Sequence, residues 1–146
     1  MRDDIVEIAR GWIGTPYCHH ASRRGAGSDC LGLIRGVWRE LFAREPEAVP
    51  HYTSDWAEAS GEERLWSAAG RHLVLRDPGK LPDPGSVVLF RMRSGAVAKH
   101  LGIAASRDGA ASFIHAYVGH GVVESALSQP WQQRIAACFD FPQGGN

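Results

Sequence analysis

The sequence has no excess of charge of either sign, because its 146 residues include 16 lysines and arginines and 16 aspartates and glutamates. A balanced chain creates no long-range field that would attract a nucleic acid or an anionic membrane. The sequence also has no run of about 18 apolar residues, the length that a membrane-spanning helix needs. We therefore expect no nucleic-acid partner and no membrane insertion.

Cysteine is scarce, and its three copies, Cys18, Cys30 and Cys138, are an odd number. That number argues against a disulfide scaffold and favours at least one free thiol. The N-terminus leads directly into an amphipathic pattern, without the basic and apolar segments of a secretion signal. We therefore expect synthesis in the cytoplasm, with another carrier responsible for any action outside it.

The first half of the chain has helical periodicity. Apolar residues recur at helical spacing over residues 3–13, where residues 14–16 end the pattern, and again over residues 30–44. Ser60 and Glu63 have the spacing of a capping box, which predicts a third helix that reaches about residue 73. These patterns predict helices in the N-terminal half.

From residue 86 onward the period changes to that of strands. Short apolar runs predict strands at residues 87–90, 101–105, 112–118, 121–125 and 135–141. The residues Arg107, Asp108 and Gly109 predict a hairpin turn between the second and third of them. Helices followed by strands with short connections predict a single α+β domain with an antiparallel sheet.

Cys30 stands where the second predicted helix begins. A turn precedes it, and Ser28 or Asp29 can cap the first free N–H groups of the helix. The dipole of the helix favours a thiolate in its first turn, which predicts a pKa of the Cys30 thiol below the ordinary value of ~8.5. A free cysteine is more often a small buried hydrophobe, so its assignment as a nucleophile depends on the rest of the chain.

Two histidines supply the partners that a cysteine nucleophile needs. His100 and His115 lie at equal distances from the predicted hairpin turn, so antiparallel pairing places the two imidazoles side by side on one face. A single histidine in a strand is more often structural. A pair combined with Cys30 instead favours a nucleophile, a base and a group that orients the base.

A zinc site is the competing interpretation of the cysteines and histidines. Cys18, His19 and His20 precede Cys30, but two adjacent histidines cannot easily face one ion, and the spacings are not those of structural zinc sites. We therefore expect no metal and no other cofactor.

With these residues assembled, the chain resembles the NlpC/P60 family of papain-like cysteine peptidases. The resembling segments are residues 12–17, 28–33, 84–90, 100–103 and 113–116, in the order of the family. The resemblance implies one papain-like α+β domain over residues 1–146, with N-terminal helices packed on an antiparallel sheet and a family-variable insertion at residues 46–84.

The resemblance also implies roles for single residues. Cys30 is the nucleophile, His100 the base and His115 the group that orients it. The residues next to the substrate and the oxyanion are Tyr17, Ser28 and Asp29. The family uses no cofactor and hydrolyses peptidoglycan stem peptides, typically at the γ-D-glutamyl–diaminopimelate bond.

The sequence at residues 54–56, 98–100 and 139–142 resembles that of the family branch encoded in tail gene clusters of phages and gene transfer agents. This implies tail or baseplate proteins as partners, and delivery in the particle to the periplasm or cell wall. Two alternatives stay open: a structural tail-tip or baseplate subunit with little activity, and an amidase or acyltransferase on the same scaffold.

The chain departs from the family at positions that flank the expected cleft. Leu31 replaces the usual serine after the cysteine, and Ser86 replaces an aspartate at the start of the first strand. Residues 19–21 replace a common Trp-Gly-Gly. The substrate subsites are therefore less well predicted than Cys30 and the two histidines.

Overall fold

The computed structural model describes residues 3–45, 63–77, 79–93 and 95–142. The helices are α1 (Asp3–Arg10), α2 (Cys30–Phe42), α3 (Arg64–His72) and α4 (Gln129–Gln132). The strands are β1 (Ser22–Arg23), β2 (Gly27–Ser28), β3 (Val74–Leu75), β4 (Val87–Arg91), β5 (Ala98–Arg107), β6 (Ala110–Tyr117), β7 (Gly121–Ala126) and β8 (Ile135–Asp140). The prediction of an α+β fold with N-terminal helices and an antiparallel sheet is confirmed.

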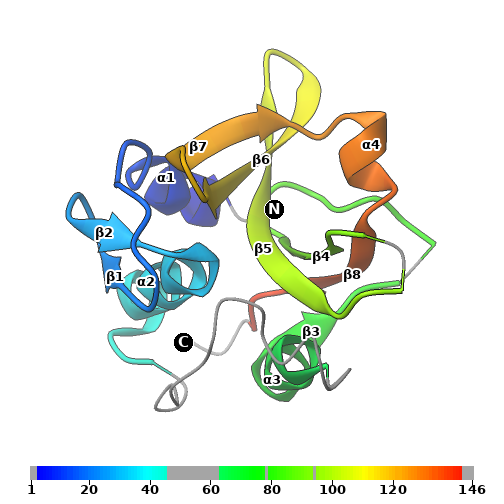
Figure 1. Ribbon diagram of the computed structural model, residues 1–146, viewed down its shortest axis with the longest axis horizontal. Helices are drawn as coiled ribbons and strands as arrows, with labels where there is room; N and C mark the ends of the chain where they lie inside the picture. The colour runs from blue at the N-terminus through cyan, green and yellow to red at the C-terminus, as the bar shows by residue number, and fades with distance from the viewer. Residues whose placement is uncertain (1–2, 46–62, 78, 94, 143–146) are drawn as a thin grey trace.

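The main sheet has six strands in the order β3-β8-β4-β5-β6-β7, and neighbouring strands are antiparallel. Figure 1 shows α1 and α2 on one side of β5 and β6, with α4 on the opposite side. Asp108 and Gly109, with φ angles of 55° and 80°, form the turn between β5 and β6. Positive φ at both central residues matches the right-handed twist of the two strands.

The two faces of the sheet bury different side chains, because neighbouring residues of a strand point to opposite faces. The helix-side face packs against α1 and α2 with residues such as Val87, Leu89, Leu101, Ile103, Ile114 and Ala116. The aromatic face has its own core, formed by Val88, Phe90, Ala104, Phe113, Leu127 and Cys138, with Trp131 of α4 packed against it. The sheet therefore separates a large, mostly aliphatic core from a smaller one that contains the rings of Phe90, Phe113 and Trp131.

The first helix is shorter than its pattern predicts. It ends at Arg10, after which a turn leaves Ile13 45% exposed while Trp12 is 2% exposed. The Trp12 ring occupies the space beside Gly36 of α2, where a Cβ atom would lie 2.0 Å from the ring. Because Gly36 has no side chain, the ring that follows α1 packs directly on α2.

The third predicted helix is confirmed as α3, but its predicted cap is different. Ser60 lies outside the described residues, and Glu63 makes no capping hydrogen bond with its side chain. Its carboxylate instead accepts hydrogen bonds from Arg91 Nη1 and from the backbone N–H of Ala98, both at 2.8 Å. Glu63 thus ties the start of α3 to the first residue of β5.

Within the described residues, no helix has the length and apolar character required to cross a membrane. Residues 46–62 of the expected family-variable insertion lie outside the described residues.

Candidate active site

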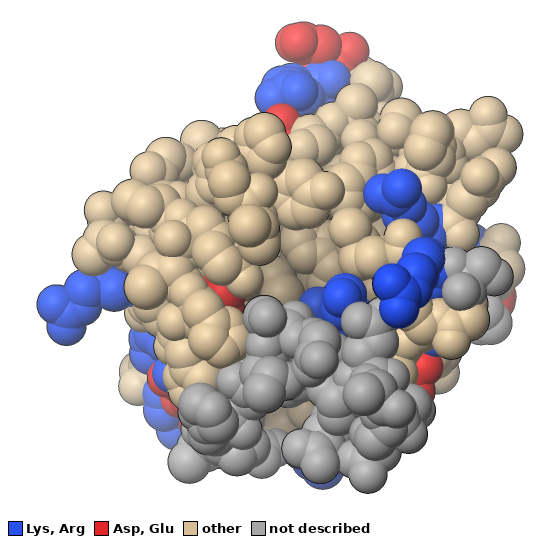
Figure 2. All heavy atoms as spheres, viewed as in Figure 1, with Lys and Arg blue, Asp and Glu red and all other residues tan. Residues whose placement is uncertain are grey.

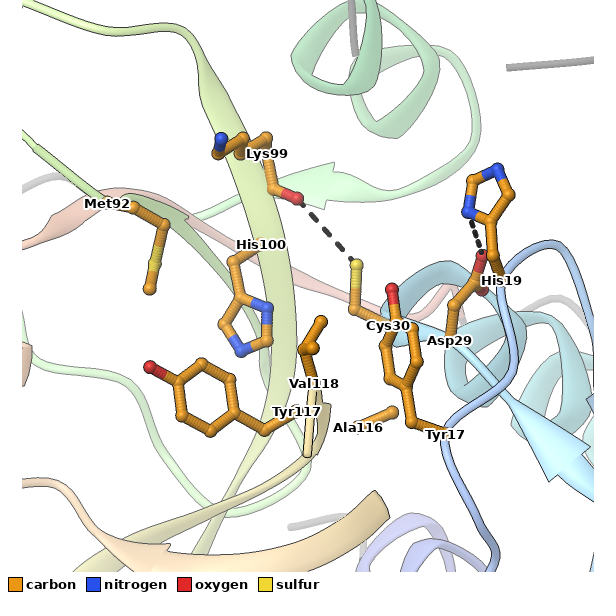
Figure 3. A pocket seen from close by; sticks show the side chains of 10 residues that line it. All are labelled: Tyr17, His19, Asp29, Cys30, Met92, Lys99, His100, Ala116, Tyr117 and Val118. Atoms are coloured by element: carbon orange, nitrogen blue, oxygen red, sulfur yellow. Dashed lines mark hydrogen bonds and ion pairs between the residues drawn. The ribbon is translucent and has the colours of Figure 1, made fainter. Parts of the chain in front are cut away.

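A pocket opens beside the start of β5, and both faces of the sheet contribute to it. Its cavity volume is about 260 Å³, slightly below the range of typical small-molecule sites. The lining residues are Tyr17, His19, Asp29, Cys30, Met92, Lys99, His100, Ala116, Tyr117 and Val118 (Figure 3). Figure 2 shows the hollowed surface, with basic side chains gathered on one margin.

Cys30 is the first residue of α2, as the sequence predicts. Asp29 is the N-cap, and its Oδ1 accepts a hydrogen bond of 2.7 Å from the N–H of Gly32. The Cys30 residue is 8% exposed, and its thiol donates to the carbonyl of Lys99 with an S–O distance of 3.7 Å. The cap therefore fixes the helix end that carries the sulfur at the pocket.

The prediction of a lowered thiol pKa is wrong for this structure. Burial raises the pKa of the Cys30 thiol to about 12, and the charge of Asp29 acts in the same direction. The backbone N–H groups of Leu101, Leu31 and Cys30 lower the pKa, but they do not compensate for the lost hydration. The thiol is therefore protonated at neutral pH and needs a base before it can attack.

His100 and His115 form a direct pair on the aromatic face. His100 Nε2 lies 2.7 Å from His115 Nδ1, and the two residues are 7% and 1% exposed. In Figure 3 the other nitrogen of the His100 ring is on the side of Cys30. Among the described contacts the Cys30 thiol bonds to Lys99 rather than to His100, so the nucleophile and base share the pocket without a hydrogen bond at rest.

The pairing register differs from the predicted one. The turn is centred one residue later than expected, so Ile103 pairs with Ile114. Extending this register places His115 opposite Gly102, which makes the two histidines diagonal neighbours on one face. A Cβ atom at Gly102 would lie 2.9 Å from the Phe113 ring, so this glycine makes room for the side chains beside His115.

Both imidazoles are neutral at neutral pH. Burial is the main cause that lowers the pKa of His100, and the nearby His115 adds to it. Burial likewise lowers the pKa of His115, with a contribution from His120. A neutral imidazole can accept the proton of a neutral thiol, so the pair matches the chemistry of a general base and its orienting group.

Trp131 of α4 covers the histidine pair, a position that its sequence context does not predict. The centre of its ring lies 5.9 Å from that of His100 and 5.5 Å from that of His115. Phe113 packs on His115, with 4.2 Å between the centres of the two rings. A helix of four residues and a single tryptophan carry no functional signal in sequence, so only the fold reveals this aromatic enclosure.

The three residues expected beside the nucleophile have different positions. Tyr17 and Asp29 line the pocket, whereas Ser28 is fully buried and donates from its Oγ to the carbonyl of Asp29. Burial, together with the charges of Cys30, Asp29 and Cys18, raises the pKa of Tyr17 to about 12, which keeps its phenol protonated as a donor. The structure therefore places Ser28 as a support behind the pocket.

Asp29 also holds the loop that precedes α2. Its Oδ2 accepts a hydrogen bond of 2.7 Å from the backbone N–H of His20, and it lies 3.8 Å from Nδ1 of His19. In that loop β1 and β2 form a two-stranded hairpin, which the sequence does not predict because two-residue strands have no periodicity.

In the described part of the chain, no group of three or more histidine, cysteine or acidic residues could hold a metal ion.

No family model matches the chain. The probable endopeptidase NlpC of Escherichia coli K12 is 27% identical over 92% of this chain and 77% of its own length. The murein DD-endopeptidase and LD-carboxypeptidase MepS of the same organism is 25% identical over 92% of this chain. This chain spans 60% of the length of MepS.

Solved structures agree with this relationship. An NlpC/P60 family protein from Bacillus cereus matches 97% of this chain with a TM-score of 0.63 and 19% identity, over 40% of its own length. The NlpC/p60 domain of the peptidoglycan hydrolase SagA matches 97% of this chain and 99% of that domain, with a TM-score of 0.61 and 19% identity. The chain therefore has the NlpC/P60 fold and is homologous to peptidases of that family.

Proposed function

We propose that this chain is a cysteine peptidase that hydrolyses peptidoglycan stem peptides. The observation that carries the proposal is the shared pocket of Cys30 and His100, with His115 bonded to His100 at 2.7 Å. These are the nucleophile, base and orienting group of a thiol-dependent acyl transfer. The relatives named as murein or peptidoglycan hydrolases support this substrate class.

The neutral resting state determines the order of proton transfer. As the Cys30 sulfur attacks the substrate carbonyl carbon, the thiol proton moves to Nδ1 of His100 and a C–S bond forms. The imidazolium then gives that proton to the departing amine, and the C–N bond breaks. A water molecule, deprotonated by His100, hydrolyses the thioester and restores the thiol.

The start of α2 supplies donors for the oxyanion that forms during attack. The backbone N–H of Cys30 lies at the positive end of the helix. Tyr17 lines the same pocket and keeps its phenolic proton, so it is the second donor in this mechanism. Neither donor has to change its protonation state when the negative charge develops.

We assign the cleaved bond to γ-D-glutamyl–diaminopimelate because of the resemblance to the family. Stem peptides carry free carboxylates, and Lys99 at the pocket, with the basic margin in Figure 2, suits an acidic substrate. MepS is named for two other bonds, a DD cross-link and an LD linkage, so the homology alone does not select the bond.

Digestion of purified peptidoglycan followed by mass analysis of the muropeptides tests the activity and the bond together. We expect fragments cut between the second and third stem residues, with no release by Cys30→Ala. Cys138→Ala is the matched control, because it removes a buried thiol that does not line the pocket. Monomers freed from cross-links, or loss of a terminal D-alanine, would replace this assignment with a DD- or LD-specific one.

We further propose that the enzyme acts as part of a phage or gene-transfer-agent tail, at the periplasm or cell wall. The support is the resemblance at residues 54–56, 98–100 and 139–142, of which the first segment lies outside the described residues. Detection of the chain in purified particles tests the association. Particles with Cys30→Ala that infect normally would favour a structural subunit instead.

A further inference from the structure

The second ring nitrogen of His115 faces a serine. His115 Nε2 lies 2.9 Å from Oγ of Ser125 on β7, while its Nδ1 faces His100. In the pairing of β6 with β7, Phe113 is opposite Ser125 and His115 is opposite Val123, so the serine is on the aromatic face. Ser125 does not line the pocket.

The proton positions along this chain of contacts are linked. If His115 carries its proton on Nε2, it donates to Ser125, and its Nδ1 accepts the proton on Nε2 of His100. His100 Nδ1 then has a free lone pair on the side of Cys30. If His115 carries its proton on Nδ1 instead, it donates to His100 Nε2, and the His100 proton occupies Nδ1, where it blocks the base.

We propose that Ser125 is a positioning residue that holds the His115 proton on Nε2 and so keeps Nδ1 of His100 open for the proton of Cys30. The inference rests on the proposed peptidase function. It deepens that function by adding a fourth member to the set of Cys30, His100 and His115. Ser125 acts through His115 and does not touch the substrate.

The contacts of His115 identify Ser125 as the group that can accept the proton on Nε2. Among the described contacts, Ser125 is the hydrogen-bond partner of His115 Nε2, and the other nearby rings are those of Phe113, Tyr117 and Trp131. After burial, the charge of His120 is the cause that lowers the pKa of His115, and the charge of His115 in turn lowers that of His100. A buried N–H without an acceptor is costly, so loss of the hydroxyl favours the blocked tautomer.

Ser125→Thr and Ser125→Val form the matched test, because they have the same shape and differ in the hydroxyl. We expect Thr to keep kcat near the wild-type value and Val to lower it roughly tenfold to a hundredfold on peptidoglycan peptides. KM should stay unchanged, because Ser125 is outside the pocket. Ser112→Ala is the control, since Ser112 is 2% exposed and donates to Glu124 on the helix-side face.

Nitrogen NMR of the labelled histidines gives a readout that needs no substrate. We expect His115 to be protonated on Nε2 in the wild type and in Ser125→Thr, and on Nδ1 in Ser125→Val. An unchanged tautomer in Ser125→Val, or equal kcat values for Thr and Val, would overturn the role of Ser125. If the tautomer changes but the wild type has no peptidase activity, the proposed function fails and the positioning by Ser125 stands.

Discussion

The two faces of the sheet carry different parts of the proposed chemistry. The helix-side face is largely aliphatic and includes Cys30 in its core. The aromatic face surrounds His100 and His115 with the rings of Phe113 and Trp131. The pocket lies where the faces meet, so the nucleophile and its base belong to different packing layers. Substitutions on the two faces should therefore have separable effects on stability and catalysis.

Each face also buries one cysteine, Cys30 on the helix-side face and Cys138 on the aromatic face, so the two thiols can be compared directly. Burial raises the pKa of Cys30 to about 12 and that of Cys138 to about 11. Only Cys30 of these two lines a pocket with a histidine. Burial alone therefore does not distinguish a nucleophile from a core residue, and the neighbouring base does.

The largest expected effect comes from removing the base on the aromatic face. His100→Ala should lower kcat/KM on stem peptides by about 10²- to 10⁴-fold, because it removes the pocket imidazole that His115 orients and that accepts the thiol proton in the proposed mechanism. His72→Ala is the control, since this histidine lies against Trp38 and does not line the pocket. Steady-state assays of both variants check this, and a tenfold or smaller loss in His100→Ala would contradict the assigned base.

A tryptophan on each face allows stability and catalysis to be separated. Trp38 is 9% exposed and packs against Phe42 and Phe141, so Trp38→Ala should cost about 3–5 kcal/mol of unfolding free energy. The folded fraction should keep its kcat. Denaturant unfolding and activity corrected for folded protein check this, and a changed kcat per folded molecule would contradict the separation.

Trp131→Ala should have the opposite profile. Trp131 is only partly buried, so we expect a loss of about 2 kcal/mol in unfolding free energy. Water that reaches the histidine pair would relieve the burial that lowers the pKa of His100 and His115. The acid limb of kcat/KM should therefore move to higher pH. An unchanged limb would mean that Trp131 does not shield the pair.

The lowered histidine pKa values predict how stability depends on pH. Below about pH 6.5 the unfolded chain takes up protons on these histidines while the folded chain does not. The unfolding free energy is therefore greatest above that pH and falls as the pH drops toward the lowered pKa values of His100 and His115. The unfolding free energy can fall by at most about 1.4 kcal/mol for each histidine and each pH unit.

Urea unfolding between pH 7 and pH 5 measures this slope. His115→Gln removes one of the two groups, so its unfolding free energy should fall less steeply than that of the wild type. Carboxylates contribute equally to both proteins, and the difference between the two slopes isolates the histidine. Parallel slopes would show that His115 titrates alike in the folded and unfolded states.

The fold was largely predictable because its signals are local. Short apolar runs predicted β4 to β8, and Asp29 and Cys30 predicted the start of α2. The register of β5 and β6 was displaced because the sequence Arg107, Asp108 and Gly109 does not reveal which two residues form the turn. Moving the turn centre by one residue shifts the strand pairing by two residues. An even shift keeps each side chain on the same face, which is why the histidines still meet.

The site was less predictable wherever it depends on three-dimensional burial. The helix dipole at Cys30 can be inferred from sequence, but the loss of hydration that raises its pKa cannot. Ser125 carries no signal, because a serine in a strand has many uses. The contacts of Trp131 depend on how α4 packs over the sheet, which the sequence does not show.

The smallest effect is expected from the Arg10–Glu124 ion pair, which tests whether charges on one face of the sheet influence the histidine pair on the other. Arg10 of α1 binds Glu124 with distances of 3.0 and 2.9 Å, on the helix-side face of the strand that carries Ser125. The Arg10 side chain is 39% exposed, so Arg10→Gln should cost only about 0.5 kcal/mol of unfolding free energy. Its kcat and acid limb should match the wild type, because Glu124 and Ser125 point to opposite faces of β7. A displaced limb would show that the charge of Glu124 reaches His115 through the sheet, and the hydroxyl of Ser125 would then share control of the histidine pair with an ion pair on the other side.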